Sequence, residues 1–187
     1  MSSFWTNASF AAAILSFGAV AVAAPVETLL GYGPWKLGMS KEEVRSIKEH
    51  GPYSDVASTG GLETAKGFFD GTPCTVSFVF GDAGLRKIQI WVYEGKSPDE
   101  AVAAWSRVYD FFRRTFGEAE NRALQLPPPV QKPQFVARLQ AALTSVPQDQ
   151  PIKIQMAPTP MPEGMKVFSS IMREPRFGYY VFVYYQR

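Results

Sequence analysis

The residue types that most often perform chemistry are scarce in this chain. Among its 187 residues there is one histidine, His50, and one cysteine, Cys74. A zinc site on His50 would need Cys74 or carboxylates as further ligands, and none lies at the spacings that zinc sites use. A Ser-His-acid or Cys-His device is equally hard to assemble, and no phosphate-binding loop or dinucleotide fingerprint is present. We therefore expect no catalytic residue, no metal site and no cofactor.

The two singular residues have structural interpretations. His50 falls at the end of a predicted helix, where a partial positive charge complements the helix dipole. Cys74 alternates with Val76, Phe78 and Phe80, which places its sulfur on the apolar face of a predicted strand. We therefore expect a capping histidine and an inert core thiol.

Acidic residues give a diffuse signal. Glu63, Asp70, Asp82 and Glu94 fall at predicted turns, where local hydrogen bonding is the usual task of such side chains. Two carboxylates can still meet in space, because glycosidase-type acids need proximity in the fold and not in the sequence. An uncharacterised carboxylate-dependent enzyme therefore stays open as an alternative function.

Aromatic residues give the one positive indication of a site. Trp91 and Tyr93 share the otherwise polar face of a predicted strand, and the segment 177–185 holds enough aromatic residues for both faces of another. Exposed Trp and Tyr on a sheet are typical anchors of protein interfaces. The competing interpretation is that a helix or connector covers them. We predict a protein-binding surface made of Trp91, Tyr93, Tyr180 and Tyr184.

The first half of the chain predicts one helix followed by strands. Ser40 and Glu43 form a capping box that starts a helix extending to His50, with Gly51 in the left-handed closing conformation. Three apolar stretches separated by turn residues then predict an antiparallel meander with one apolar face. Its strands are expected at 64–69, 74–80 and 85–93.

The second half predicts two more helices and three more strands. Ser97 and Pro98 begin a long helix, closed by Gly117, whose apolar stripe should cross the sheet. A Pro-rich connector spans 124–133, and a shorter helix follows, with Phe135 and Leu139 on its apolar side. C-terminal strands are expected at 151–157, 165–172 and 177–185. The fold class is thus α+β: an antiparallel sheet, made of the meander and the C-terminal strands, packed against two to three helices.

The N-terminal segment predicts export. Residues 1–24 contain no Lys, Arg, Asp or Glu, and small residues at Ala21 and Ala23 suit cleavage before Ala24. We expect residues 1–23 to be a cleaved signal peptide and 24–187 to form a single domain in the periplasm or outside the cell. The apolar stretch is too short for a permanent anchor, so no stable membrane insertion is expected after cleavage. A formal net charge of +2 without a basic cluster argues against nucleic-acid partners.

Residues 31–93 resemble the small extracytoplasmic modules of the SmpA/BamE and beta-lactamase-inhibitor-protein-like kinds. The resemblance rests on the run from Leu37 to Val44, on Gly51-Pro52, and on the meander ending at Ile88. Such modules place a Gly-Met-Ser/Thr helix start before a hairpin or meander and act by binding other proteins. This chain lacks the lipoprotein cysteine of the assembly factors and the disulfides of the secreted inhibitor, and its long second helix and C-terminal strands extend past the resemblance.

Three functions are compatible with these features. The leading hypothesis is a soluble, non-enzymatic, protein-binding module that contacts an envelope or secreted protein, in envelope assembly or as an inhibitor or immunity-like protein. A second is a carrier of a lipid or other apolar molecule, held between the sheet and the helix bearing Trp105 and Phe112. The third is the carboxylate-dependent enzyme.

Overall fold

The computed structural model describes residues 30–121, 123–124, 126 and 130–187. The predicted signal peptide, residues 1–23, lies outside the described residues, as do residues 125 and 127–129 of the predicted connector. In the described part of the chain, no helix combines the length and the apolar character that crossing a membrane requires.

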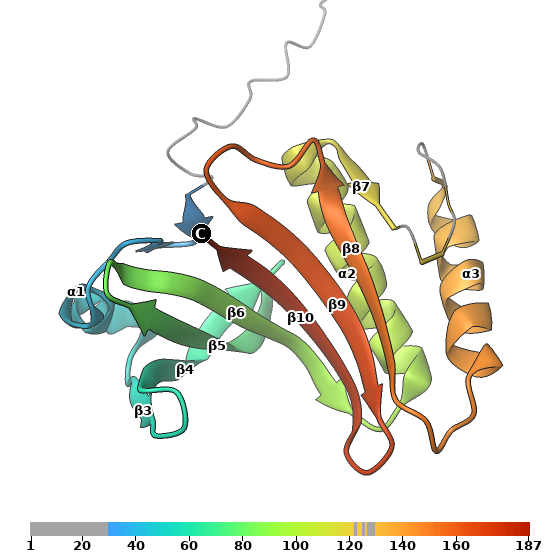
Figure 1. The fold of residues 1–187 in the computed structure, drawn as a ribbon, viewed down its shortest axis with the longest axis horizontal. Coiled ribbons are helices and arrows are strands. Elements are labelled where there is room, and N and C mark those ends of the chain that lie inside the picture. Colours follow the sequence, from blue (N-terminus) through green and yellow to red (C-terminus); the bar gives the residue numbers. More distant parts are fainter. Residues whose placement is uncertain (1–29, 122, 125, 127–129) are drawn as a thin grey trace, which may run out of the picture.

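An antiparallel sheet of eight strands forms the body of the molecule, in the order β3-β4-β5-β6-β10-β9-β8-β7, and three α-helices pack with it (Figure 1). This confirms the predicted α+β class. The last strand in the chain, β10, lies in the middle, between β6 and β9. The strands are β3 (Ser54–Val56), β4 (Gly61–Phe69), β5 (Thr72–Gly81), β6 (Gly84–Gly95), β7 (Glu118–Glu120), β8 (Ile152–Thr159), β9 (Lys166–Glu174) and β10 (Gly178–Gln186).

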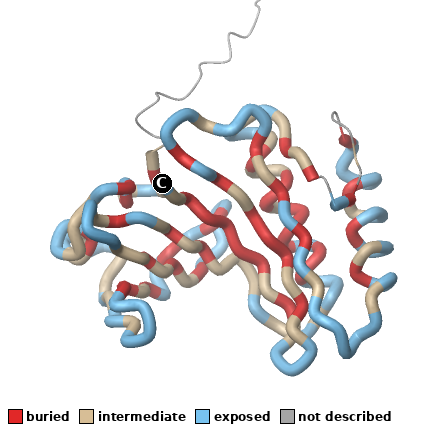
Figure 2. The backbone as a smooth tube through the Cα atoms, viewed as in Figure 1, coloured by how far each residue is buried: buried red, intermediate tan, exposed pale blue. Residues whose placement is uncertain are grey.

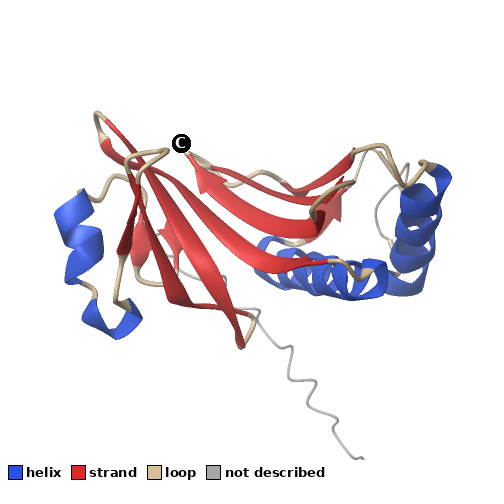
Figure 3. Cartoon of the chain, turned by 90° about the horizontal axis from the view of Figure 1, so that it is seen from below, coloured by secondary structure: helices blue, strands red, loops and turns tan. Residues whose placement is uncertain are grey.

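The remaining elements are the helices and a small second sheet. The α-helices are α1 (Lys41–Ser46), α2 (Pro98–Phe116) and α3 (Lys132–Ser145), and one turn of 3-10 helix, η2 (Lys48–His50), follows α1. Strands β1 (Gly31–Tyr32) and β2 (Trp35–Lys36) pair with each other. In Figure 3, α2 and α3 lie together on one side of the curved sheet, and α1 lies at the other end of the molecule, beside the strands of the meander.

The start of the first helix follows the sequence, but its end does not. The Ser40 hydroxyl accepts from the Glu43 amide at 3.1 Å, and the Glu43 carboxylate accepts from the Ser40 amide at 2.7 Å, which completes the predicted capping box. However, α1 ends at Ser46, and Gly51 has a φ of −83°, so the predicted left-handed closure at Gly51 is wrong.

Tertiary contacts explain this early end. The Tyr53 hydroxyl donates to the Ile47 carbonyl at 3.0 Å, and the His50 Nδ1 atom lies 2.9 Å from the Lys66 carbonyl of β4. The Thr64 hydroxyl also donates to the His50 carbonyl. These hydrogen bonds hold residues 47–50 against neighbouring elements, and the α-helix therefore does not continue through them. His50 therefore contacts a strand and does not cap the end of α1 as predicted.

The Gly-Met pair before α1 has a packing role. The Gly38 amide donates to the Leu85 carbonyl at 2.8 Å, and the Leu85 amide donates to the Met39 carbonyl at 2.6 Å. A Cβ atom on Gly84 would come within 2.3 Å of the Gly38 carbonyl oxygen, and both glycines have positive φ angles. Glycine is therefore required where the start of the first helix docks on the start of β6.

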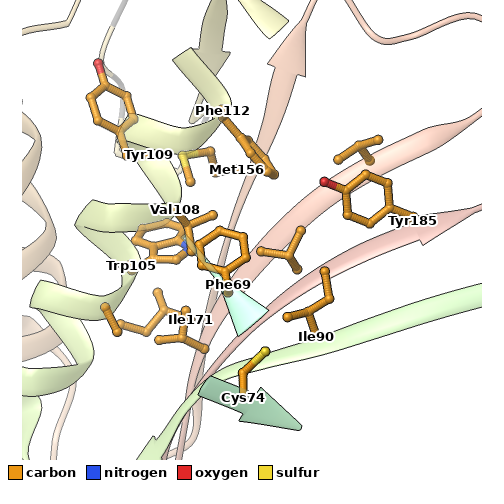
Figure 4. Packing of buried hydrophobic residues seen from close by; sticks show 14 of the residues in the cluster. Phe69, Cys74, Ile90, Trp105, Val108, Tyr109, Phe112, Met156, Ile171 and Tyr185 are labelled. Carbon is orange, nitrogen blue, oxygen red and sulfur yellow. The ribbon is translucent and has the colours of Figure 1, made fainter. Parts of the chain in front are cut away.

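The main core lies between α2 and the sheet (Figures 2 and 4). Trp105 and Phe112 of α2 have no exposed surface, and the Trp105 indole donates to the Ser169 hydroxyl of β9 at 2.8 Å. Cys74 is buried in the same cluster, as predicted, and burial raises the pKa of its thiol to about 11. Ser97 and Gly117 bound α2 where the sequence places them.

Candidate functional site

The candidate site lies on the face of the sheet opposite α2, which we call the open face. Successive side chains of β10 point to opposite faces. Val181 and Val183 belong to the main core, so Tyr180, Phe182 and Tyr184 lie on the open face. The prediction that the last strand carries aromatic residues on both faces is correct, since Tyr179 and Tyr185 belong to the core.

Five aromatic rings meet on the open face and form what we call the aromatic cluster. The Phe182 ring lies 4.7 Å from the Trp91 ring, 6.0 Å from Tyr180 and 5.7 Å from Tyr184, and the Tyr184 ring lies 4.7 Å from Phe168 of β9. Phe182 and Tyr184 are only 5% and 8% exposed, yet they lie apart from the main core. Their neighbours on the same face bury them, whereas Trp91, Tyr180 and Phe168 are half-buried.

A chain of hydrogen bonds fixes the orientation of Trp91. Its indole Nε1 donates to the Ser77 hydroxyl at 2.9 Å, and that hydroxyl donates to the Glu63 carboxylate at 2.9 Å. The three residues come from neighbouring strands β6, β5 and β4. Glu63 therefore lies in a strand and not in the predicted turn. Beside Trp91, a hollow of about 560 Å³ is bordered by Thr75, Glu94 and Glu63 among others.

Tyr93 does not belong to this cluster, because β6 contains a bulge. Trp91 pairs with Phe182, whereas Tyr93 pairs with Val181, so Val92 is an extra residue between the two pairs. Partners across a ladder share a face, and Val181 faces the core, so Tyr93 lies on the face opposite to Trp91. The Tyr93 hydroxyl donates to Glu100 at 3.0 Å and accepts from the Ser97 amide at 3.1 Å. The expectation that Trp91 and Tyr93 share a face is thus wrong.

The other predicted site residues do come together. Trp91, Tyr180 and Tyr184 all belong to the aromatic cluster, with 6.2 Å between the Trp91 and Tyr180 rings. Sequence reasoning missed Phe182 and Phe168 as members of this face. Strict alternation within 177–185 would have added Phe182, because it lies between Tyr180 and Tyr184 at a spacing of two residues.

Next to the aromatic cluster, the open face carries positive charge and a recess. The Lys87 ammonium lies 4.1 Å from the centre of the Tyr184 ring, within the range of a cation–π contact. Burial lowers the pKa of Lys87, and the nearby charges of Lys153 and Arg86 lower it further. Beyond Phe168 a recess of about 800 Å³, which we call the β8–β9 recess, is bordered by residues that include Lys153, Lys166, Phe168 and Met161.

Two acidic residues away from the open face pair with cations of another element. Asp70 lies at the turn between β4 and β5, as predicted, and pairs with Arg114 of α2 at 2.8 Å. Asp110 pairs with Lys132 of α3. Among the residues that the structure describes, no three His, Cys, Asp or Glu side chains gather closely enough to hold a metal ion.

Comparisons with protein-family models, with characterised proteins and with solved structures found no match to this chain.

Proposed function

We propose that this chain is a non-enzymatic binding module that recognises another envelope or secreted protein through the open face of its sheet. The observation that carries this proposal is the aromatic cluster, an apolar layer on the face opposite α2. Trp91, Tyr180 and Phe168 keep part of their rings exposed on this face, and exposed apolar surface gathered on one face of a folded protein is typical of interaction sites. Trp and Tyr are also the residue types most enriched among the anchors of protein interfaces.

The geometry of Trp91 suits an anchor. Its ring is half-buried against Phe182 and Tyr180 and is held by the Ser77 hydroxyl, so few of its rotamers remain to be lost on binding. Ordering a free side chain at an interface costs about 0.5–1.5 kcal/mol. A side chain that is already fixed avoids most of this cost, and the hollow beside Trp91 offers room for a partner's side chain.

Two sequence features support the cellular setting. The predicted signal peptide, residues 1–23, indicates work in the periplasm or outside the cell. The resemblance of residues 31–93 to SmpA/BamE-like and beta-lactamase-inhibitor-protein-like modules indicates a protein partner, and this segment folds as a short helix followed by the meander β4-β5-β6. Envelope assembly, inhibition of a secreted enzyme and immunity are the three roles that fit.

The hypothesis of a carrier that holds its ligand between α2 and the sheet has less support. Trp105 and Phe112, the expected walls of a ligand space, are fully buried and in contact with the main core. Side chains therefore fill the layer between α2 and the sheet. The carboxylate-dependent enzyme also gains no support from three acids in the part of the chain that the structure describes. Glu63 accepts from Ser77, and Asp70 and Asp110 pair with cations.

Site-specific photo-crosslinking tests the proposed surface. A benzoylphenylalanine introduced at Tyr180 should yield an adduct of defined mass in the periplasmic or secreted fraction. The same group at Phe177, which is 67% exposed in the turn before β10, should not. In the protein that carries benzoylphenylalanine at position 180, Trp91→Ala should lower the adduct yield about tenfold or more. Truncating a central aromatic anchor costs about 2 kcal/mol or more of binding free energy.

A second variant separates loss of contact from loss of fold. Ser77→Ala keeps the Trp91 ring but removes its hydrogen-bond partner, and it should give an adduct yield between those of Trp91→Ala and the unmodified surface. Circular dichroism should show that both variants stay folded. Equal adducts from Tyr180 and Phe177, or a yield unaffected by Trp91→Ala, would remove the aromatic cluster as the contact surface.

A further inference from the structure

Apolar side chains and two lysines are among the residues that line the β8–β9 recess. Phe168 of β9 and Met161, in the loop after β8, supply apolar walls together with Ala123 and Ala157. Met161 is 43% exposed although it is a large apolar residue. Its sulfur accepts from the Val167 amide at 3.3 Å, which fixes the side chain beside the recess. A volume of about 800 Å³ falls within the range of roughly 300–1,000 Å³ that small-molecule sites have.

The charge around this recess is not balanced. Two lysines, Lys153 and Lys166, and a single carboxylate, Glu120, border it, and Lys87 lies over the adjoining Tyr184 ring. Ion pairs within the described residues engage Lys41, Arg45, Arg113, Arg114 and Lys132, and none engages these three lysines. The charge of Lys153 lowers the pKa of Lys87, so these two ammonium groups repel each other. An anion placed among them would relieve that repulsion.

We propose that the β8–β9 recess binds a single-chain anionic amphiphile, a long-chain carboxylate, with its head group at Lys153 and Lys166 and its acyl chain against Met161 and Phe168. The apolar walls suit a hydrocarbon chain, and the volume suits one chain. The lysines supply point charges that match a small carboxylate head. The Phe168 ring touches Tyr184, so the chain would end beside the aromatic cluster.

Calorimetric titration of the purified protein with dodecanoate tests this site. Saturable binding with one molecule per chain is expected. Dodecyltrimethylammonium, which has the same tail and the opposite charge, should bind at least about tenfold more weakly, and so should butyrate, which keeps the carboxylate but lacks the tail. Carbon-13 labelling of the methionine methyl groups adds a second readout. The Met161 signal should shift on titration, whereas the Met39 signal, beside α1, should not.

Three variants locate the site. The double variant Lys153→Gln with Lys166→Gln should weaken dodecanoate binding about tenfold or more. Phe168→Ala should weaken it through loss of the apolar wall. Lys48→Gln, which removes an exposed lysine in η2 at the other end of the molecule, is the matched control and should bind as the unmodified protein does. All of these lysines are exposed, so the fold should survive their substitution.

Several results would overturn the proposal. They are the absence of saturable dodecanoate binding, equal binding of the cationic amphiphile, full binding by the double lysine variant, and a Met161 methyl signal that does not move. An acidic peptide that binds as tightly as dodecanoate at this site would also overturn it, because the recess would then recognise charge alone. The site does not depend on the protein contact proposed above, since the crosslink at Tyr180 can fail while dodecanoate binding persists.

Discussion

A single arginine connects the last turn of α3 to the sheet. Arg173 of β9 is 1% exposed, and its guanidinium donates to the carbonyls of Leu143 at 3.2 Å, Val146 at 3.0 Å, Pro147 at 2.6 Å and Gln150 at 2.9 Å. Backbone carbonyls at a helix end carry partial negative charge and lack partners within the helix. The buried cation therefore has four oxygen acceptors in place of a carboxylate.

Replacing this arginine should destabilise the whole protein. Arg173→Met leaves three of these carbonyls without the guanidinium donor, whereas the Pro147 carbonyl still accepts from the Gln150 amide at 3.0 Å. We expect the free energy of unfolding to fall by about 2–4 kcal/mol, because hydrogen bonds to charged groups are worth roughly 1.5–3 kcal/mol each and are not additive. Arg173→Lys should recover only part of the loss, since an ammonium cannot reach all four oxygens. Urea denaturation measures both.

Arg176 provides the control for this prediction. It is an exposed arginine in the turn between β9 and β10, three residues further along the chain. Arg176→Met should change the free energy of unfolding by no more than about 0.5 kcal/mol. If the two methionine variants unfold at the same urea concentration, the carbonyl contacts of Arg173 contribute no net stability.

At the scale of residues, the sequence predicts which face of the sheet a side chain lies on wherever apolar and polar residues alternate regularly along a strand. Cys74, Val76 and Phe78 are all buried, as their spacing in β5 indicates. Trp91, Tyr180 and Tyr184 share a face as expected. Tyr93 escapes prediction because one extra residue reverses the alternation, and no residue type marks that position in β6.

At the scale of elements, the bulge in β6 decides which residues reach each face. Val92 is the extra residue between the Trp91–Phe182 and Tyr93–Val181 pairs. It allows Trp91 to join the aromatic cluster while Tyr93 bonds to Ser97 and Glu100 at the start of α2. One strand thus contributes to the candidate site and to the attachment of the main helix.

This geometry predicts an unusual tolerance to deletion. Removing Val92 would leave Trp91 opposite Phe182 and Tyr93 opposite Val181 in a regular ladder, so we expect a folded protein that is less stable by about 1–3 kcal/mol. Removing Gln89, three residues earlier, would carry Ile90 to the open face and Trp91 into the core. That deletion should cost more than about 4–5 kcal/mol. Urea denaturation followed by circular dichroism compares the two, and equal losses would argue against the assigned register.

Elements with strong local signals are the ones that sequence predicts. The helix α2 begins after Ser97, at Pro98, and ends before Gly117, both in the prediction and in the structure. The three-residue strands β3 and β7 were not predicted, because segments this short carry no periodic pattern. The end of α1 was missed for another reason: Tyr53, Thr64 and Lys66 bind residues 47–50 from outside the helix.

At the scale of the whole molecule, strand order is what the sequence could not supply. The C-terminal strands were predicted from their composition, but nothing in 177–185 indicates that this strand pairs with β6 as well as with β9. In that central position, β10 joins the meander to the strands of the second half of the chain. Its alternate residues then join both the main core and the aromatic cluster, so the candidate site depends on a pairing between distant segments.

The central place of β10 also predicts how the molecule unfolds. One continuous core extends from Trp35, beneath the meander, through Trp105 of α2 to Tyr185 of β10. Neither half can lose β10 without exposing its own side of this core, so we expect 24–187 to unfold as a single cooperative unit. Variants that keep Trp35, Trp91 or Trp105 as the only tryptophan of the folded domain would report from three regions. Their fluorescence should change at the same urea concentration as the far-ultraviolet circular dichroism of the same variant. Each fluorescence midpoint is compared with the circular dichroism midpoint of the same variant. If the Trp105 fluorescence changes at a lower urea concentration than the Trp35 fluorescence on this comparison, α2 and the C-terminal strands separate from the meander. The chain would then contain two folding units joined at β10.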